Sequence, residues 1–429
     1  AQRLKSAASL IDGLGGEKVR WKELSQELQI TYDNVTGDIL LASGVIAYLG
    51  AFTVTYRDQA TSGWAAILQS QAITCADTFK LADTLGEAVK IRAWTIQKLP
   101  NDAFSIDNAI MLERSDRWPL MIDPQGQANK WVRNMEVDSD LKLCKQNQPT
   151  FVRTIENAIS FGQPVLLENV PETLDPILES VLLKAVVTAG GVSTIRLGDA
   201  QVEYDARFRL YITTKMPNPH YSPETCVKVN LLNFMATAEG LQDQMQGLVV
   251  TTEQPALAKK SEELVLEDAS NKKQLKEIEN KILEVLSSSS GNILDDEVLI
   301  STLAESKKTS TEVGIRVKEA EVTSTEINIA CTRFTPVATR GAILYFVITD
   351  LALIDPMYQN SLTFFVRLFD RSIRSAPKSD DEAKRRMYNS SQITRDVFAN
   401  ICRGLFERHK LIFSFMIVAN ILQRARQMK

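Results

Sequence analysis

Histidine is scarce in this sequence, and its cysteines follow no pairing pattern. Among 429 residues there are two histidines and five cysteines, and no CxxC motif joins any of them. A zinc site needs several such side chains at close spacing, so we expect no metal site. An odd cysteine count without a signal peptide indicates a reducing compartment for the scattered thiols, which are Cys75, Cys144, Cys226, Cys331 and Cys402.

Excess positive charge and long apolar runs are also missing. The net charge is −4 and the pI about 5.6, and no basic stripe is interleaved with aromatic residues, so we expect no nucleic-acid partner. The longest apolar run, LIFSFMIVANIL at 411–422, is too short to span a bilayer. We therefore expect a buried helix there and no membrane partner.

A chain of this length predicts two or three packed units. Between residues 118 and 250, short apolar runs alternate with helical patterns, which predicts an α/β unit with a parallel sheet and helices on both faces. The predicted strands are WPLMID (118–123), LKLCKQ (141–146), PVLLEN (164–169), RFRLYITT (207–214) and the end of LQDQMQGLVV (241–250). A hairpin that turns at Gly198-Asp199 is predicted at 194–205, and an amphipathic helix at 173–186.

The N-terminal part of the sequence predicts helices. Residues 1–32 predict two helical stretches broken at Gly13, Gly15 and Gly16. Residues 38–57 are apolar on nearly all sides and predict a buried helix with Asp38 as its N-cap. The chain starts without Met and ends directly after a helical pattern, so we expect it to be part of a longer polypeptide.

From about residue 256 the sequence becomes rich in Lys and Glu, and apolar residues recur at steps of three and four. Two such stretches joined by the polar turn SSSSGN (287–292) predict an antiparallel coiled-coil hairpin with arms about 45 Å long. The alternative is a charged helix pair packed flat on the body. The seam positions are Leu264, Asn271, Leu275, Ile278, Ile282 and Val285, and then Leu299, Leu303, Ser306, Ser310, Val313, Val317, Ala320, Ser324, Ile327 and Cys331.

The stretch PQGQANKW has the length and the lysine of a phosphate-binding loop of the form GxxxxGK[ST], and it follows a predicted strand. Pro124 stands at the first glycine and has no N–H to donate. Asn129 stands at the second glycine, and Trp131 replaces the hydroxyl residue that holds Mg²⁺. Lys130 is kept, so one functional side chain of the loop survives, and Gly126 stands at one of the variable positions between the two glycines.

A second motif is degenerate in the same way. A working partner strand ends in Asp-Glu, whereas PVLLEN places Glu168 and Asn169 at those positions, and an amide cannot act as the base for water. Both lesions together predict a fold that no longer hydrolyses ATP. Two alternatives stay open: Lys130 and Glu168 as a structural salt bridge, and a loop that binds nucleotide without hydrolysis. Whether Trp131 fills the pocket or swings out of it would separate them.

Several stretches together resemble the motor region of dynein heavy chains, and the resemblance extends along nearly the whole chain. One of them, LPNDAFSIDNAIM (99–111), resembles the axonemal heavy chains in particular. These stretches are LIDGLGGEKVRW (10–21), RWPLMIDPQGQANKW (117–131), FRLYITTKMPNPHYSPE (208–224), VNLLNFMATAEGLQDQMQGLVV (229–250) and LPNDAFSIDNAIM (99–111).

This resemblance implies the fifth AAA+ module of a dynein ring: a P-loop-type parallel sheet with flanking helices, an antiparallel coiled-coil strut and a helical small subdomain. The implied divisions are 1–32 for the stalk base and the link from the fourth module, 33–250 for the large subdomain, 251–331 for the strut or buttress, 332–385 for the small subdomain, and 386–429 for the start of the sixth module.

The function implied is a module that does not hydrolyse ATP and transmits ring movements through the strut to the stalk of a minus-end-directed axonemal motor. We expect no cofactor in this chain, with ATP and Mg²⁺ in other modules. The implied partners are the neighbouring modules and stalk, microtubules through the absent stalk tip, and intermediate and light chains through the absent tail. The implied location is the cytoskeleton of a cilium or flagellum, the axoneme.

Two further residues stand out. The resemblance places Lys228, in CVKVNLL, where a basic residue faces nucleotide held by the fourth module, although the usual residue there is Arg. The alternative is a solvated lysine. His220 is expected to be a packed structural histidine, because no nucleophile or carboxylate lies near it in the sequence.

Overall fold

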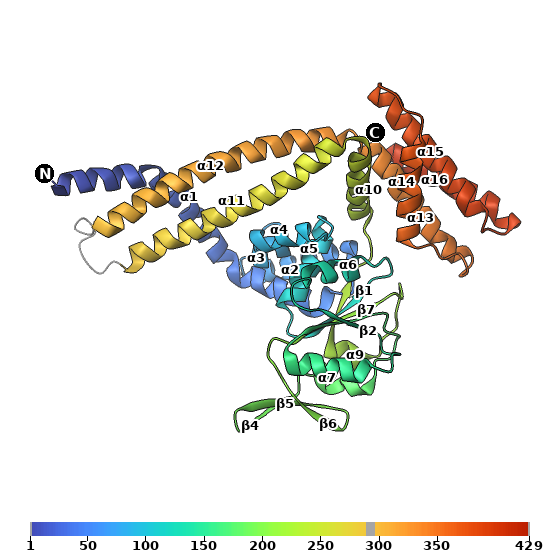
Figure 1. Ribbon diagram of the computed structural model, residues 1–429, viewed down its shortest axis with the longest axis horizontal. Helices are drawn as coiled ribbons and strands as arrows, with labels where there is room; N and C mark the ends of the chain where they lie inside the picture. Colours follow the sequence, from blue (N-terminus) through green and yellow to red (C-terminus); the bar gives the residue numbers. More distant parts are fainter. Residues whose placement is uncertain (1, 289–296, 428–429) are drawn as a thin grey trace.

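The computed structural model describes residues 2–288 and 297–427. Figure 1 shows a body that contains a sheet, a long helical hairpin, and a bundle of helices at the C-terminal end of the chain. The predicted α/β class is confirmed, and so are the coiled-coil type hairpin and the separate helical unit.

The body is built on five parallel strands in the order β2-β3-β7-β1-β8. Four of them are the predicted apolar runs. All five residues of β1 are buried, as are all four of β3, because parallel strands are covered on both faces. The strands are β1 (Trp118–Ile122), β2 (Lys142–Cys144), β3 (Pro164–Leu167), β7 (Arg209–Thr214) and β8 (Val229–Asn233).

Helices cover both faces of the sheet, and successive strand residues point to opposite cores. Leu120 packs in the core with Ile155 of α7, whereas Met121 packs in the core with Trp131 of α6. The helices of the body are α2 (Val54–Ser70), α3 (Leu81–Leu85), α4 (Ala88–Ile96), α5 (Ala103–Arg114), α6 (Gln127–Met135), α7 (Phe151–Phe161), α8 (Glu179–Leu182) and α9 (Pro223–Lys228).

A small antiparallel sheet of β4 (Val186–Ala189), β5 (Val192–Leu197) and β6 (Ala200–Glu203) projects from the body (Figure 1). The predicted hairpin turn is confirmed, and Gly198 has a φ of +61° there. The predicted long helix at 173–186 is wrong. A 3₁₀ turn, η2 (Pro176–Leu178), and the short α8 replace it, because Lys184 takes a left-handed φ of +50° and the chain then enters β4.

In the parallel sheet, one predicted strand is wrong and one strand was missed. The run at 241–250 lies inside a helix, α10 (Ala238–Glu253), which begins where the Thr237 side chain accepts a hydrogen bond from the Gly240 N–H. The fifth strand is β8 instead. It pairs with β1 along its whole length.

The N-terminal helix α1 (Gln2–Gly44) is continuous, so the predicted break at Gly13, Gly15 and Gly16 is wrong. Asp38 is not an N-cap. It lies inside α1, and its carboxylate accepts a hydrogen bond from the backbone N–H of Ala76. The predicted single helix at 38–57 is wrong, because α1 ends at Gly44, a π-helical turn follows and α2 begins at Val54. Its first part is buried on one face only, since Leu41, Ala42, Val45 and Leu49 are buried whereas Ile39, Leu40 and Tyr48 are exposed.

The base of α1 is held by a π-helical turn, η1 (Val45–Leu49), and by the buried side chain of Arg57. The Arg57 guanidinium donates to the carbonyl oxygens of Leu49 (3.0 Å) and Gly50 (2.8 Å) and to Asn108 Oδ1 (2.7 Å). These carbonyls have no partner within a helix, so a cation here completes the helix end. Burial lowers the pKa of Arg57 to about 10, which leaves it charged.

Gly50 lies against the edge strand. A Cβ there would lie 2.4 Å from the carbonyl oxygen of Leu231 in β8, so only glycine fits. The Gly50 carbonyl also accepts the Asn233 N–H at 2.8 Å. The base of α1 is therefore fixed to the sheet itself.

The antiparallel hairpin consists of α11 (Pro255–Ser288) and α12 (Glu297–Thr332), which lie side by side and extend away from the body (Figure 1). Of the predicted seam, Val313, Val317 and Ile327 are buried, and Ile278 is half-buried. The side chains of Leu275, Ile282, Val285 and Leu303 lie outside the described residues, as do positions 289–296 of the turn.

Besides α10, which precedes it, the hairpin packs against two elements from earlier in the chain. Helix α12 packs against α1, and α11 packs against α4 of the body. The second contact includes an ion pair between Arg92 and Asp268. The hairpin thus joins the N-terminal helix to the body at places other than the base of α1.

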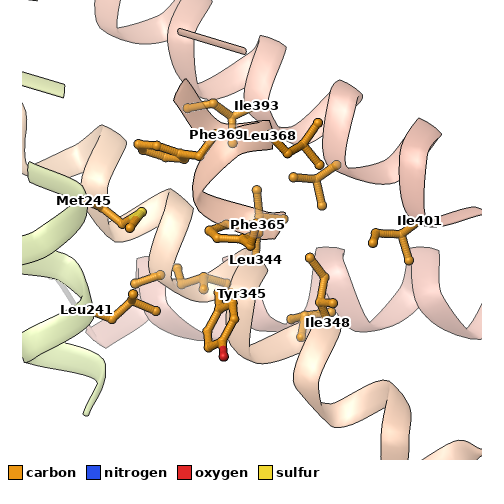
Figure 2. Close-up of a cluster of buried hydrophobic side chains, with 14 of the residues drawn as sticks. Leu241, Met245, Leu344, Tyr345, Ile348, Phe365, Leu368, Phe369, Ile393 and Ile401 are labelled. Carbon is orange, nitrogen blue, oxygen red and sulfur yellow. The ribbon is translucent and has the colours of Figure 1, made fainter. Parts of the chain in front are cut away.

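The C-terminal bundle has one hydrophobic core, built by α10 and the four helices that follow the hairpin. Figure 2 shows Leu241 and Met245 of α10 facing Leu344, Tyr345 and Phe365 in this core. The bundle helices are α13 (Thr335–Ile354), α14 (Leu362–Ser375), α15 (Glu382–Cys402) and α16 (Glu407–Gln427).

Two helices of the bundle bear on the membrane prediction. Within the described residues, α13 alone is long and apolar enough to cross a membrane, but it is the central helix of this core, and Leu344 and Leu351 are fully buried. In α16 the prediction of a buried helix is wrong for one face. Phe413 and Ile417 are buried, whereas Leu411 and Phe415 are 79% and 71% exposed.

The divisions implied by the resemblance stay predictions, and the elements cross several of them. The division after residue 32 falls inside α1, the one after 250 inside α10, and the one after 385 inside α15. The helices beyond 385 share the core of the bundle with α13 and α14, through residues such as Ile393 and Val397.

Candidate functional site

The loops that follow β1, β2, β3 and β7 meet at the carboxyl edge of the sheet, where parallel α/β folds bind ligands. A cavity of about 520 Å³ lies there. The first residues of α14 close its other side. Both predicted motifs line this cavity, through Pro124, Gly126, Asn129, Lys130, Glu168 and Asn169.

Trp131 is the member of the predicted loop that lies elsewhere. Its side chain is fully buried in the core beneath α6, edge-on to Trp94 at 6.3 Å and stacked on Phe234 at 5.9 Å between ring centroids. It therefore does not fill the cavity. The position that would hold Mg²⁺ in a working loop is now part of the hydrophobic core.

A carboxylate occupies the N–H groups of the loop. Asp123, directly after β1, accepts the backbone N–H of Gln127 at 2.8 Å and that of Asn129 at 2.9 Å. These donors open α6, and helix N-termini of this kind hold phosphate in working loops. Burial raises the pKa of Asp123 to about 6 against the lowering effect of these hydrogen bonds, so its carboxyl is ionised at neutral pH.

The second motif is tied to the first by Glu168. Its carboxylate accepts from the Asn129 side chain at 2.8 Å and forms an ion pair with Arg133. The alternative pairing with Lys130 is wrong, because Arg133 takes that role. Burial acts to raise the pKa of Glu168, but the hydrogen bonds from Asn129 and Arg133 outweigh it and hold the pKa below its usual value.

Asn169 is in the left-handed region, with φ of +55°, a conformation that asparagine tolerates better than most residues. The residue that would position water in a working site therefore sits at a sharp turn of the chain. Val170, the next residue, donates its N–H to the carbonyl of Thr213 at 3.0 Å, which ties the turn to β7.

Four cations surround the cavity: Lys130 and Arg133 on α6, Lys145 after β2, and Lys215 after β7. Sequence reasoning found only the first. The others follow the ends of parallel strands or lie one turn along α6, so the order of the strands was needed to bring them together. Asp123 was visible in the motif as the residue before Pro124, but its role depends on the backbone geometry.

The residues present do not fit ATP with Mg²⁺. Pro124 offers no N–H, Trp131 offers no hydroxyl, and the N–H groups of Gln127 and Asn129 already donate to Asp123. No group of three or more metal-ligating side chains occurs in the part of the chain that the structure describes.

The two remaining predicted residues lie away from this cavity. Lys228, at the end of α9, forms an ion pair with Glu179, so it is not simply a solvated lysine. His220 is exposed on a loop, where its backbone N–H donates to Glu172, so the prediction of a packed histidine is wrong.

These features define a class of protein. A parallel sheet in this strand order, with a degenerate phosphate loop at its carboxyl edge and a helical bundle beside it, is the architecture of an AAA+ module. Comparison with known families adds two matches: residues 92–313 match the ATP-binding dynein motor region, and residues 1–66 match the microtubule-binding stalk of the dynein motor. The chain belongs to the dynein heavy chain family.

Individual relatives agree with this. The chain is 51% identical to dynein axonemal heavy chain 3 of Mus musculus over 99% of its length, and 48% identical to that of Homo sapiens over its whole length. It is 45% identical to human dynein axonemal heavy chain 6 over 98% of its length. It spans about a tenth of the length of these relatives. The axonemal resemblance is confirmed.

Proposed function

We propose that this chain is the non-hydrolysing fifth module of an axonemal dynein heavy chain, and that it transmits movements of the ring to the microtubule-binding stalk. The motor as a whole hydrolyses ATP in other modules and moves toward the minus end of the microtubule. In this proposal the module holds no nucleotide, and its partners are the neighbouring modules and the stalk of the same chain. Contacts with intermediate and light chains would be made elsewhere in the heavy chain.

The observation that carries the proposal is the double attachment of the hairpin. Helix α12 lies on α1, which the stalk comparison covers in full, and α11 is tied to the body by Arg92 and Asp268. A hairpin fixed to both elements passes a displacement of one to the other. A helix pair that contacted only solvent would not.

The degenerate site supports the same function. A module that opened and closed around its own nucleotide would add an independent movement between the body and the bundle. Here the backbone N–H groups of Gln127 and Asn129 donate to Asp123, so they do not bind a nucleotide phosphate that would drive such a movement. Force entering the module is then passed on by a rigid unit.

The test uses the heavy chain motor that contains this segment. Arg92→Glu should weaken the tie between hairpin and body, and should reduce the change in microtubule affinity that ATP produces. The double variant, Arg92→Glu with Asp268→Arg, should restore part of it. Arg196→Glu, on the exposed small sheet, is the matched control. Microtubule co-sedimentation with and without ATP measures the effect. An unchanged response in Arg92→Glu would rule out the hairpin as the element that transmits movement to the stalk.

A second candidate is a module that holds ADP or ATP as a structural ligand. The observation in its favour is the 520 Å³ cavity lined by Lys130, Arg133, Lys145 and Lys215. Calorimetry of the purified chain with ATP and ADP, with and without Mg²⁺, separates the two candidates. Saturable binding of ATP or ADP that Lys130→Ala abolishes would establish the structural ligand. The absence of any binding heat at high micromolar protein supports a module that transmits movement without nucleotide.

A further inference from the structure

The carboxylate of Asp123 lies at the N-terminus of α6, in the place that a phosphate takes in a working loop. Its two oxygens accept different backbone N–H groups, Gln127 at 2.8 Å and Asn129 at 2.9 Å. The residue is almost fully buried. A carboxylate and a phosphate compete for the same donors, because both are anions that accept N–H groups.

The surroundings of Asp123 are those of an anion site. The charged groups that face the cavity are Lys130 and Arg133 from α6, Lys145 from the loop after β2, Glu168 from the loop after β3, and Lys215 from the loop after β7. Glu168 is already paired with Arg133 and accepts a hydrogen bond from the Asn129 side chain. Three lysines therefore face a cavity whose backbone donors are held by a residue of the chain itself.

The cavity has room for a phosphate group without any movement of Trp131. That side chain lies under α6 and is not part of the lining. The loss of the hydroxyl residue and the closure of the N–H groups are thus two separate changes. The first removes the metal ligand, and the second removes the phosphate contacts.

We propose that Asp123 is an internal competitor for phosphate, an autoinhibitory contact that keeps this cavity free of nucleotide. The inference rests on the proposed function in one respect, namely that the module does not cycle nucleotide. It adds the cause: the site is closed by a carboxylate rather than by the loss of its cations. Removing that carboxylate uncovers a site for a phosphate anion that needs no metal.

The experiment measures binding of inorganic phosphate to the whole chain at pH 7.5 by ³¹P line broadening, and of ADP without Mg²⁺ by calorimetry. Asp123→Ala should bind phosphate and ADP at least tenfold more tightly than the unsubstituted chain. Lys130→Ala in the same chain should reverse most of the gain. Asp199→Ala, on the exposed turn of the small sheet, is the matched control and should behave as the unsubstituted chain does.

Each outcome decides the matter. Tight binding confined to the Asp123 variants establishes the competitor. Equal binding by all variants refutes it, as does the absence of binding in a folded Asp123→Ala chain. Should that variant fail to fold, Asp123→Asn removes the charge at almost the same size and frees one of the two N–H groups, because Nδ2 cannot accept, so it should show a smaller gain in the same direction. This experiment measures phosphate and ADP binding, whereas the proposed function is tested by microtubule affinity. Failure of this inference and failure of the proposed function are therefore distinguishable.

Discussion

Replacing Trp131 by threonine would restore the residue type that a phosphate loop normally has, and the structure predicts that it damages the protein instead. The side chain is fully buried and packs on Trp94 and Phe234. Truncation of a buried tryptophan typically costs about 3–5 kcal/mol, and the new hydroxyl would be buried among apolar side chains. We therefore expect Trp131→Thr to lower the free energy of unfolding by at least about 3 kcal/mol.

Urea unfolding followed by far-ultraviolet circular dichroism measures this. In a thermal experiment the same loss corresponds to a fall in Tm of roughly 6–12 °C for a unit of this size. The control is Phe161→Thr, an aromatic residue that is 68% exposed at the end of α7, which should change stability by about 0.5 kcal/mol or less. A loss below about 1 kcal/mol for Trp131→Thr would show that the indole is not part of the core. A gain of Mg²⁺-dependent ADP binding would refute the reasoning about the loop.

Three further predictions concern the hairpin, the bundle and pH. Asn271 is buried in the hairpin, and its Nδ2 has no hydrogen-bond partner among the side chains that the structure describes. Asn271→Leu should therefore stabilise the protein by about 1–2 kcal/mol and raise its Tm, whereas Gln274→Leu, at an exposed position, should not. Arg385 is buried and binds both oxygens of Glu253, so Arg385→Met should cost about 3–5 kcal/mol in urea unfolding, against less than about 1 for Arg386→Met. The pKa of Asp123 is about 6 in the folded state and about 4 in the unfolded state. The contribution of this group to stability is therefore fully present below pH 4 and is lost as pH rises through 6, which lowers the free energy of unfolding by about 3 kcal/mol. The difference in unfolding free energy between the unsubstituted chain and Asp123→Asn, measured from pH 4 to 7, should follow that curve, and a flat difference would contradict the buried carboxylate.

The sequence predicted the elements whose residues are buried on every side. WPLMI and PVLL are continuous apolar runs because helices cover both faces of a parallel strand. The heptad steps predicted the hairpin for a similar reason, since each arm has one apolar stripe. Strand β8 was missed because VNLLN carries an asparagine at each end of its apolar centre. Those amides are satisfied by distant groups, such as the carbonyl of Met111 for Asn230.

The long helix α16 shows the opposite error. Its apolar residues are too numerous for the core that the described chain provides, so a sequence rule that buries apolar runs overstates the burial of Leu411 and Phe415. Composition records how apolar a helix is, whereas burial depends on what packs against it. Nothing in the local sequence distinguishes the two faces.

The sequence predicted both motifs of the candidate site, but neither the other cations around the cavity nor its chemistry. The degenerate loop and the second motif were both found, and the structure places them on one cavity. The role of Asp123 could not be predicted, because it depends on two N–H groups that point at one carboxylate only after the loop has closed. The partner of Glu168 was missed because Arg133 reaches it from one turn beyond Lys130 on α6.

The fixed base of α1 has a consequence for leverage. Helix α1 has 43 residues and bends along its length (Figure 1), and the π-helical turn that follows it is fastened by Arg57 and Gly50. A tilt of about 5° at that fastening displaces a point about 30 Å along the helix, about 20 residues away, by roughly 3 Å, which is about half a helical turn. The packing at Gly50, where no side chain fits, therefore sets the pivot of a lever.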